Sequence, residues 1–407
     1  MLKKRVLQIF FICLTIFTLW YLDGVFCIKS AHGINQARGL YYQPKNTIDV
    51  VMMGSSHVHC DIDTGLLWNE HGIASYDYSA AEQPLWCTYY YLREFCKYQN
   101  PKVVVLDLYS PARFKDDYQY VWLNQNLNGM RFSMNKLGMI VDSVEPRKIG
   151  RIFPDFVTYH GRVDTLKAED FLYPFTVRKD LQNFKGFTPY LKREPQEEPV
   201  IDETASVGVT VKSEIYLTKI IEYTQENDIE LFLVVTPYIT SAEDEKVYNR
   251  LKEIAEYYGV QFNSTNYDYG EIGLDFEKDF NDESHLNYWG AYKFTHYLGG
   301  ELKRRFEIPD RRGEKGYDSW QKNYEEIAEY VKEIPDRVVF ERMVTVMFFG
   351  KSDKDVRLSD SQYKKLVKNM GKRERKEFDR KQKQLQRERD DDWLLGMLFL
   401  TDDSDDM

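Results

Sequence analysis

The sequence predicts an α/β fold, a three-layer sandwich in which helices cover both faces of a mainly parallel sheet. The run Ile48–Met53 is β-branched and apolar and has no polar face after Asp49, which is typical of a strand buried on both sides. The run Lys102–Tyr109 repeats this pattern. Helical patterns lie between such runs, and strands separated by helices of this length indicate right-handed crossovers and a parallel sheet.

The same criteria locate the other elements along the chain. The expected elements, in order, are a strand at 48–53, a helix to about 71, a short strand near 73–78, a helix at 84–98, a strand at 102–109, a helix at 211–227, a strand at 230–236, a helix at 242–258, a short strand at 260–262 and a helix at 289–306.

Three segments after residue 22 lie outside this regular pattern. Residues 23–45 contain Gly, Ser and Pro44 without clear periodicity and are interpreted as a tether before a domain at 46–308. Residues 110–208 are rich in aromatics and prolines, and a stretch this long is improbable as an idle loop, so we expect a helical insertion that forms one wall of the site. Residues 309–407 are densely charged and are expected to form a partly helical tail of unassigned role.

The amino terminus carries a candidate membrane anchor. Lys3, Lys4 and Arg5 precede an apolar run from Val6 to Leu22. About 17 residues at ~1.5 Å each span roughly 25 Å, the lower limit for crossing a bilayer. The basic residues would keep the start of the chain in the cytoplasm and place the rest outside. A cleaved signal peptide is the alternative, but no small-x-small cleavage site precedes Asp23.

Composition excludes some classes of function. The chain has 407 residues, 43% of them hydrophobic, and a net charge of −10. An acidic chain of this kind lacks the excess of basic residues that is typical of proteins that bind nucleic acid. Five cysteines at 13, 27, 60, 87 and 96 match no metal-binding spacing, and no disulfide framework or cofactor is expected.

A candidate nucleophile follows the first strand. Gly54 allows a sharp turn at the edge of the sheet where α/β folds bind ligands, and Ser55 and Ser56 come directly after it. On this segment alone, the favoured explanation is a strand-to-helix turn in which one serine is the N-cap of the following helix.

A second segment changes this balance. Asp282 and His285 lie three residues apart before the last predicted helix. A serine attacks an acyl carbon only when a base takes its proton, and an acid must hold that base in the right tautomer. Asp282 and His285 can supply both groups, although Asp282 taken alone also reads as a helix cap.

These two blocks resemble the SGNH (GDSL-type) hydrolase family. Gly54-Ser55-Ser56 stands for Gly-Asp-Ser, and Asp282-Glu-Ser-His285 stands for Asp-x-x-His, with Gly290 and Ala291 behind it. The resemblance covers roughly residues 47–305 and is strongest to the membrane-anchored, DltD-like branch that acts on cell-envelope polymers. It implies an SGNH/flavodoxin-like fold and a catalytic triad of Ser56, His285 and Asp282.

The resemblance also implies a function. We expect an extracytoplasmic acyl-esterase or O-acyltransferase that acts on an acylated cell-envelope glycan or teichoic polymer, with a membrane-bound O-acyltransferase as the expected partner. The glycine and asparagine blocks that supply oxyanion donors in the family are replaced here by Asp77–Pro84 and by Asp107-Leu-Tyr-Ser. The Ser56 backbone N–H is therefore the one oxyanion donor that can be assigned from the sequence.

Two other functions compete with this prediction. The departures at the oxyanion blocks fit a non-catalytic scaffold that only binds glycan or an acyltransferase. His57 and His59, followed by Asp61 and Asp63, fit the start of a metallohydrolase site, because alternate residues of a strand point the same way. Gly54 argues against that pair, since helical geometry after the turn would separate the two imidazoles. We then expect His57 to line the cleft and His59 to pack or cap.

Overall fold

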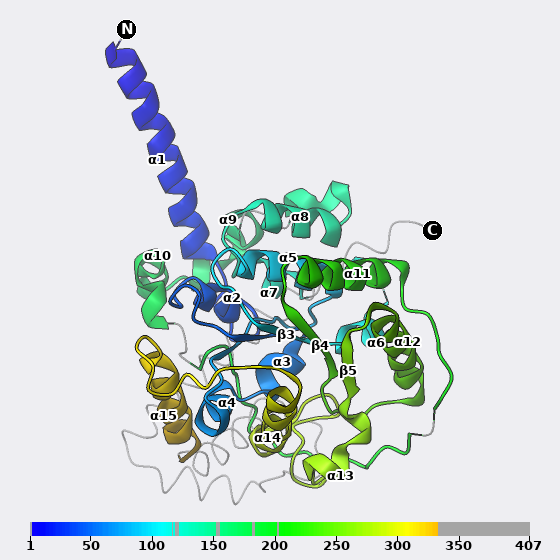
Figure 1. Cartoon of the computed structure of the whole chain (residues 1–407). Helices are drawn as coiled ribbons and strands as arrows, with labels where there is room; N and C mark the ends of the chain where they lie inside the picture. The colour runs from blue at the N-terminus through cyan, green and yellow to red at the C-terminus, as the bar shows by residue number, and fades with distance from the viewer. Residues whose placement is uncertain are drawn as a thin grey trace, which may run out of the picture. The chain divides into compact units, whose positions relative to one another are not determined.

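A computed structural model describes residues 2–332 except 116, 119–121, 152–154, 181–183 and 202. It contains a five-stranded, all-parallel sheet in the order β2-β1-β3-β4-β5 (Figure 1). This is the flavodoxin-like, doubly wound order, so the predicted three-layer α/β class is confirmed. The strands are β1 (Val50–Met53), β2 (Ser75–Asp77), β3 (Val103–Asp107), β4 (Glu230–Val235) and β5 (Gln261–Ser264).

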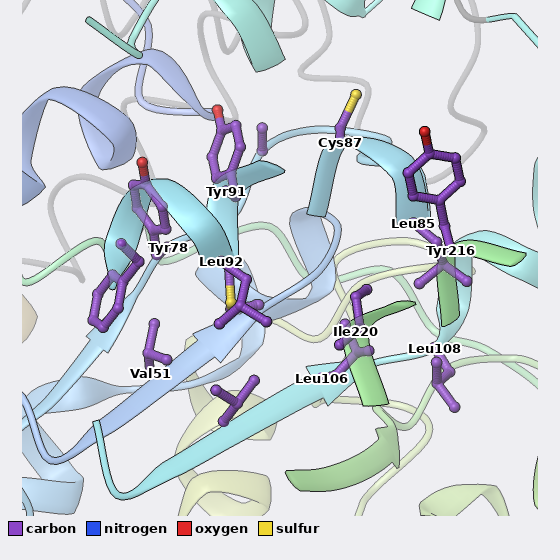
Figure 2. Close-up of a cluster of buried hydrophobic side chains, with 14 of the residues drawn as sticks. Val51, Tyr78, Leu85, Cys87, Tyr91, Leu92, Leu106, Leu108, Tyr216 and Ile220 are labelled. Atoms are coloured by element: carbon purple, nitrogen blue, oxygen red, sulfur yellow. The ribbon is translucent and has the colours of Figure 1, made fainter. Parts of the chain in front are cut away.

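The residues of the inner strands alternate between two apolar layers. Val51 and Met53 of β1 belong to one buried cluster, and Val50 and Met52 belong to the other. Figure 2 shows part of the first cluster, in which Leu92 and Ile220 lie over the sheet. The first layer is covered by α5 (Leu85–Phe95), α11 (Val211–Glu226) and α12 (Ala242–Tyr258), and the second by α3 (Ser56–Asp61), α4 (Thr64–His71) and α14 (Tyr288–Arg305).

Helix ends follow local sequence signals. Ser241 and Asp244 form a capping box at the start of α12, and Gly259 ends this helix in the left-handed conformation with φ 70°. The expected single helix from the first turn to His71 is instead two helices, because Asp63 begins α4 with a new cap on the backbone N–H groups of Gly65 and Leu66.

The insertion between β3 and α11 is helical, as expected. Trp86 of α5 donates to the Ser143 hydroxyl at 3.0 Å, which holds the insertion against the first layer. Its described helices are α6 (Tyr109–Arg113), α7 (Leu123–Leu127), α8 (Met134–Ser143), η1 (Pro146–Arg151), α9 (Asp155–Thr158), η2 (His160–Thr165) and α10 (Ala168–Asp180). The short helices η3 (Thr265–Tyr267) and α13 (Tyr269–Ile272) lie between β5 and α14.

The interpretation of residues 23–45 as a tether is wrong. Helix α1 (Leu2–Phe26) continues past Leu22, and α2 (Ile34–Leu40) packs into the domain with Ile34 and Leu40 fully buried. The Tyr76 hydroxyl of β2 donates to the Gln36 carbonyl at 2.7 Å. The segment is therefore a structural part of the domain.

The predicted domain end at 308 is too early. Arg311 forms a two-pronged ion pair with Asp49, at 2.8 and 2.9 Å, and Trp320 donates from its indole to the Ser75 carbonyl at 3.0 Å. The first compact unit of the chain runs from Met1 to Ile327, and α15 spans Asp318–Lys332. The expectation of a charged, partly helical tail beyond this point, at residues 333–407, lies outside the described residues.

Candidate active site

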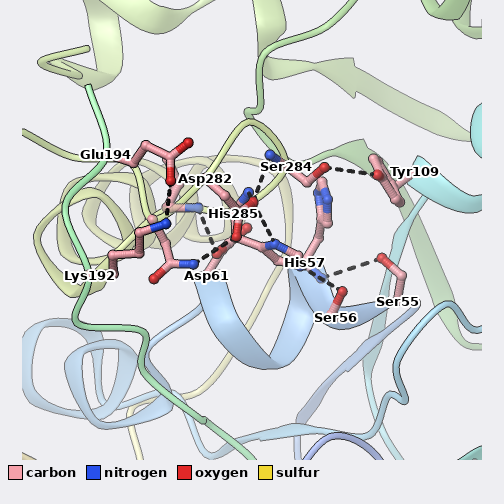
Figure 3. A network of polar contacts seen from close by, with 12 residues as sticks. Ser55, Ser56, His57, Asp61, Tyr109, Lys192, Glu194, Asp282, Ser284 and His285 are labelled. Carbon is pink, nitrogen blue, oxygen red and sulfur yellow. Dashed lines mark hydrogen bonds and ion pairs between the residues drawn. The ribbon is translucent and has the colours of Figure 1, made fainter. Parts of the chain in front are cut away.

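The candidate site lies at the carboxyl edge of the sheet, where β1 and β3 end side by side. The order β2-β1-β3 means that the chain leaves β1 toward one edge and β3 toward the other, which is the switch point where doubly wound folds open a crevice. Ser56 follows β1, and Asp107 is the last residue of β3. Figure 3 shows how these two strand ends meet the loop that carries Asp282 and His285.

Gly54 makes the turn out of β1 possible. Its φ is 144°, and a Cβ at this position would lie 2.8 Å from Cβ of Asp107 and 3.1 Å from the Asp107 carbonyl oxygen. Only glycine fits this close approach without displacing β3. The chain can therefore bend at once into α3.

The two serines after Gly54 have different roles. Ser55 is the N-cap of α3 and accepts from the His57 backbone N–H, while its own hydroxyl donates to Asp107 Oδ2 at 3.1 Å. Burial raises the pKa of Asp107 to about 6, opposed by hydrogen bonds from Thr236 and Ser55. Ser56 is the first residue of α3, and its side chain faces the opposite loop.

That loop is held in shape by its own backbone. Phe280 and Leu286 form an antiparallel bridge, and Asp282 Oδ1 accepts from the backbone N–H groups of Ser284 at 2.9 Å and His285 at 3.0 Å. The helix that follows, α14, is capped by Asn287. Asp282 is thus not the cap of this helix but the residue that closes the turn beneath His285.

The three predicted catalytic residues lie together in one chain of hydrogen bonds. His285 Nδ1 lies 3.0 Å from Asp282 Oδ1, and His285 Nε2 lies 2.8 Å from Ser56 Oγ. Because a carboxylate can only accept, Nδ1 must carry the proton, which assigns Nε2 as the acceptor from the Ser56 hydroxyl. This is the donor and acceptor order that a serine nucleophile requires.

The electrostatics keep Asp282 ionised. Burial would raise the pKa of this carboxyl, but the hydrogen bond and charge of His285, together with the bonds from Ser284 and Asn281, bring the pKa well below its ordinary value. An ionised Asp282 holds His285 in the tautomer whose Nε2 accepts from Ser56.

Asp61, the last residue of α3, joins this helix to the loop that carries Asp282 and His285. Its Oδ1 accepts from the Leu286 backbone N–H at 3.1 Å, and its Oδ2 has no partner among the described residues. Burial, then the charge of Asp282, raises the pKa of this carboxyl well above its ordinary value. We therefore assign Asp61 a structural role, since its hydrogen bond to Leu286 ties α3 to the turn before α14.

His57 and His59 point to different surroundings. The His57 ring is fully buried and stacks on Tyr109 with the ring centroids 3.8 Å apart, at 5.2 Å from the His285 ring. His59 Nδ1 lies 2.9 Å from Ser79 Oγ, and its Nε2 lies 3.3 Å from His32 Nδ1. The sequence hypothesis that both imidazoles reach one ion is wrong, because helix α3 separates them as Gly54 predicted.

Among the described residues, one group of potential metal ligands includes His59 without His57. It consists of His32, His59 and Cys60, whose ligand atoms lie within 4.8 Å of one another. The short distance between His32 and His59 is accounted for by their hydrogen bond. This group lies beside the triad and includes none of its members.

Two segments stand where the SGNH resemblance leads us to expect oxyanion donors, one at Asp77–Pro84 and one after β3. The structure gives both of them other contacts. In the segment that replaces the glycine block, the Ala80 N–H donates to the Gly54 carbonyl and the Ala81 N–H donates to the His32 carbonyl. Tyr109, which follows β3 near the position of the family asparagine, stacks on His57, and its hydroxyl lies 3.2 Å from Ser284 Oγ.

Sequence reasoning missed two residues that border the triad. The Tyr190 ring meets the His285 ring edge-on at 5.2 Å, and it also contacts the ring of His32. Tyr190 comes from the end of the insertion and His32 from the segment taken for a tether. Neither position carries a local motif, so only the tertiary fold could bring them to the site.

Comparisons with known proteins add little to this description. No family model matches the chain, and no curated protein matches it. Five chains of solved structures match. One is a provisionally assigned acylhydrolase from Bacteroides fragilis, with 11% identity and a TM-score of 0.36 over 68% of this chain and 98% of that chain. Because that TM-score is low, the fold rests on the sheet order and the site on its own geometry.

Proposed function

We propose that the protein is an extracytoplasmic, membrane-anchored serine acyl-esterase or O-acyltransferase that works through Ser56, His285 and Asp282. The observation that carries this proposal is the pair of hydrogen bonds from Ser56 Oγ to His285 Nε2, 2.8 Å, and from His285 Nδ1 to Asp282 Oδ1, 3.0 Å. Ser56 and His285, which are 229 positions apart in the chain, lie here in the arrangement that a nucleophile and its base require.

The proposed reaction has two halves. Ser56 Oγ forms a bond to the acyl carbon while its proton passes to His285 Nε2, and the alcohol that leaves takes this proton as the ester bond breaks. Water or a sugar hydroxyl then attacks the acyl-enzyme with His285 acting as base, and Ser56 recovers its proton. The Ser56 backbone N–H is the oxyanion donor we assign.

The amino-terminal helix supports an anchor that is retained. Lys3–Phe26 is long and apolar enough to cross a membrane, as a signal sequence also is. Its last turn, however, is part of the domain: Val25 and Cys27 are buried, and Arg162 Nη1 donates to the carbonyls of Phe26 and Cys27 at 2.7 and 2.6 Å. Cleavage near residue 22 would cut this helix just before that turn and remove the ring contacts of Trp20 and Tyr21 with Phe175.

The substrate class and partner remain as the sequence resemblance implies them. We propose an acylated cell-envelope glycan or teichoic polymer as substrate, and a membrane-bound O-acyltransferase as the partner that supplies the acyl group. The anchor supports this, because a domain held at the membrane surface meets such polymers where they are made. Protease added to intact cells stripped of their wall should reach the domain, and protection of the whole chain would contradict the orientation.

The non-catalytic scaffold is the rival function, and a fluorophosphonate probe separates the two. An active enzyme should be labelled at Ser56, and Ser56→Ala should abolish the labelling. Ser55→Ala is the matched control, since that hydroxyl is bonded to Asp107 and should not be needed for labelling. A folded parent protein that takes up no probe would support the scaffold.

A further inference from the structure

Three consecutive helices of the insertion, each of which contacts α1, expose large apolar side chains. Val157 of α9, Val163 of η2, and Phe171, Leu172 and Phe175 of α10 have exposed fractions between 43% and 61%. We call these five residues the insertion patch. Apolar side chains of this size that gather on neighbouring short helices mark a surface that meets something other than water.

The insertion patch is continuous with helix α1. The Phe175 ring lies 5.6 Å from the Trp20 ring and 6.0 Å from the Tyr21 ring, and the Tyr21 hydroxyl donates to the Phe171 carbonyl at 3.2 Å. A Cβ on Gly24 would lie 2.7 Å from Pro174, so the two helices cross at close range. Figure 1 shows α1 leaving the domain beside α9 and α10.

Helix α10 is divided into a face toward the domain and a face away from it. On the inner face, Asp170 is buried and pairs with Lys29 at 2.7 Å, while Tyr173 is buried and accepts from Arg38 at 2.6 Å. Phe171, Leu172 and Phe175 lie on the other face, at the spacing of one helical turn. The hydrogen bonds and the ion pair on the inner face hold α10 against the domain, and its apolar side chains are therefore exposed on the opposite face.

Two aromatic residues of α1, Trp20 and Tyr21, indicate where the insertion patch lies relative to a bilayer that α1 spans. Trp and Tyr concentrate where a spanning helix leaves the hydrocarbon, because one end of each ring system is apolar and the other is polar. Trp20 and Tyr21 are the last aromatics of α1 before its buried end, and they contact Phe175 directly. If α1 spans the bilayer, the insertion patch lies at the height of the lipid headgroups.

We propose that the insertion patch lies in the interface of the membrane that α1 spans, so that the domain is held in one orientation by two attachments. This inference rests on the retained anchor of the proposed function. Short helices that place an apolar face at the headgroup and acyl boundary bind there by burying that face. A second attachment stops the domain from swinging about the end of α1 and fixes the height at which the site meets a membrane-bound substrate.

Environment-sensitive labels on the full-length protein in lipid nanodiscs test this directly. Native Cys13 in α1, which is exposed, reports on the anchor. Leu172→Cys in a Cys13→Ser background reports on the insertion patch. Tyr257→Cys of α12, whose parent side chain is 83% exposed, is the matched control for a surface position. Each site receives the same nitroxide, and its accessibility to apolar oxygen and to a water-soluble nickel chelate is measured.

We expect the labels at 13 and 172 to be accessible to oxygen and protected from the chelate, and the label at 257 to show the reverse. Lipid-like behaviour at 13 with aqueous behaviour at 172 would overturn the second attachment and leave the anchor intact. Aqueous behaviour at 13 would overturn the anchor, and the inference with it. If the label at 172 becomes protected only when a partner protein is added to the nanodiscs, the patch binds protein and the lipid proposal is wrong.

Discussion

The Ser55 hydroxyl donates to Asp107 Oδ2 at 3.1 Å, across the gap between the ends of β1 and β3. Because Ser55 is committed to this bond and to the cap of α3, the next residue in the chain, Ser56, is the one that faces His285. Two adjacent serines thus divide structural and proposed catalytic roles, and the division can be tested one residue at a time.

Ser55→Ala should leave most of the activity in place while destabilising the domain. Loss of an N-cap side chain costs about 1 kcal/mol, and Asp107 would also lose a donor inside the protein. The measurement is release of acetate from an activated ester, with denaturant unfolding of the same preparation. If Ser55→Ala were inactive and Ser56→Ala active, the assignment of the nucleophile would be off by one residue.

Ser56→Ala and His285→Ala should each remove nearly all turnover, on the order of 10⁶-fold in kcat for a triad that acts as a unit. The double variant should be little worse than either single variant, because each change already disables proton transfer from Ser56 to His285. Circular dichroism checks that the variants are folded, and Ser55→Ala serves as the control for a serine lost at the same turn. Losses that multiply in the double variant would argue against a shared mechanism.

Asp282→Asn should be severe but milder, on the order of 10⁴-fold in kcat. An asparagine can donate its amide to His285 Nδ1, which would place the proton on Nε2 and leave no acceptor for the Ser56 hydroxyl. It also removes the charge that supports the imidazolium. Steady-state kinetics should show the loss in kcat more than in KM. Full activity of folded Asp282→Ala and His285→Ala would remove the basis for the proposed triad.

The fold and the meeting of Ser56, His285 and Asp282 were predictable because their signals are local. The apolar run before Gly54 identifies a buried strand, and the block from Asp282 to His285 keeps its chemistry within four consecutive residues. The parallel sheet also followed once helices were seen to alternate with strands, since such connections are right-handed crossovers between parallel strands.

The surroundings of the site were not predictable, because they depend on contacts between segments that are far apart in the chain. Ile34 and Leu40 belong to a helix of seven residues, too short for its periodicity to be recognised, and the helix is stabilised by packing against β2 and α7. Trp320 is buried by a strand 245 residues earlier in the chain, although its own segment is charged. Contacts between distant segments of this kind leave no pattern in either segment alone.

His32 should make the protein sensitive to acid. Burial, and then the charge of His285, lowers the pKa of this imidazole from 6.5 to about 4 in the folded state. A histidine whose folded pKa is depressed contributes stability that is complete above the unfolded pKa of about 6.5 and is lost as the pH falls through about 4. Lowering the pKa of His32 from 6.5 to about 4 corresponds to about 3 kcal/mol, as an order of magnitude.

The test compares the parent with His32→Gln, which keeps a side chain able to donate to His59. Denaturant unfolding of the detergent-solubilised chain is measured from pH 7 to pH 4. Buried carboxyls with raised pKa values, such as Asp107 and Asp61, act in the opposite direction but are common to both proteins, so the difference between the two curves reports on His32 together with its partner His59, whose pKa is lowered by burial and then by His32. We expect the parent to lose about 3 kcal/mol more than the variant over this range. Circular dichroism at pH 7 checks that both are folded, and parallel curves would show that His32 is not held neutral by burial.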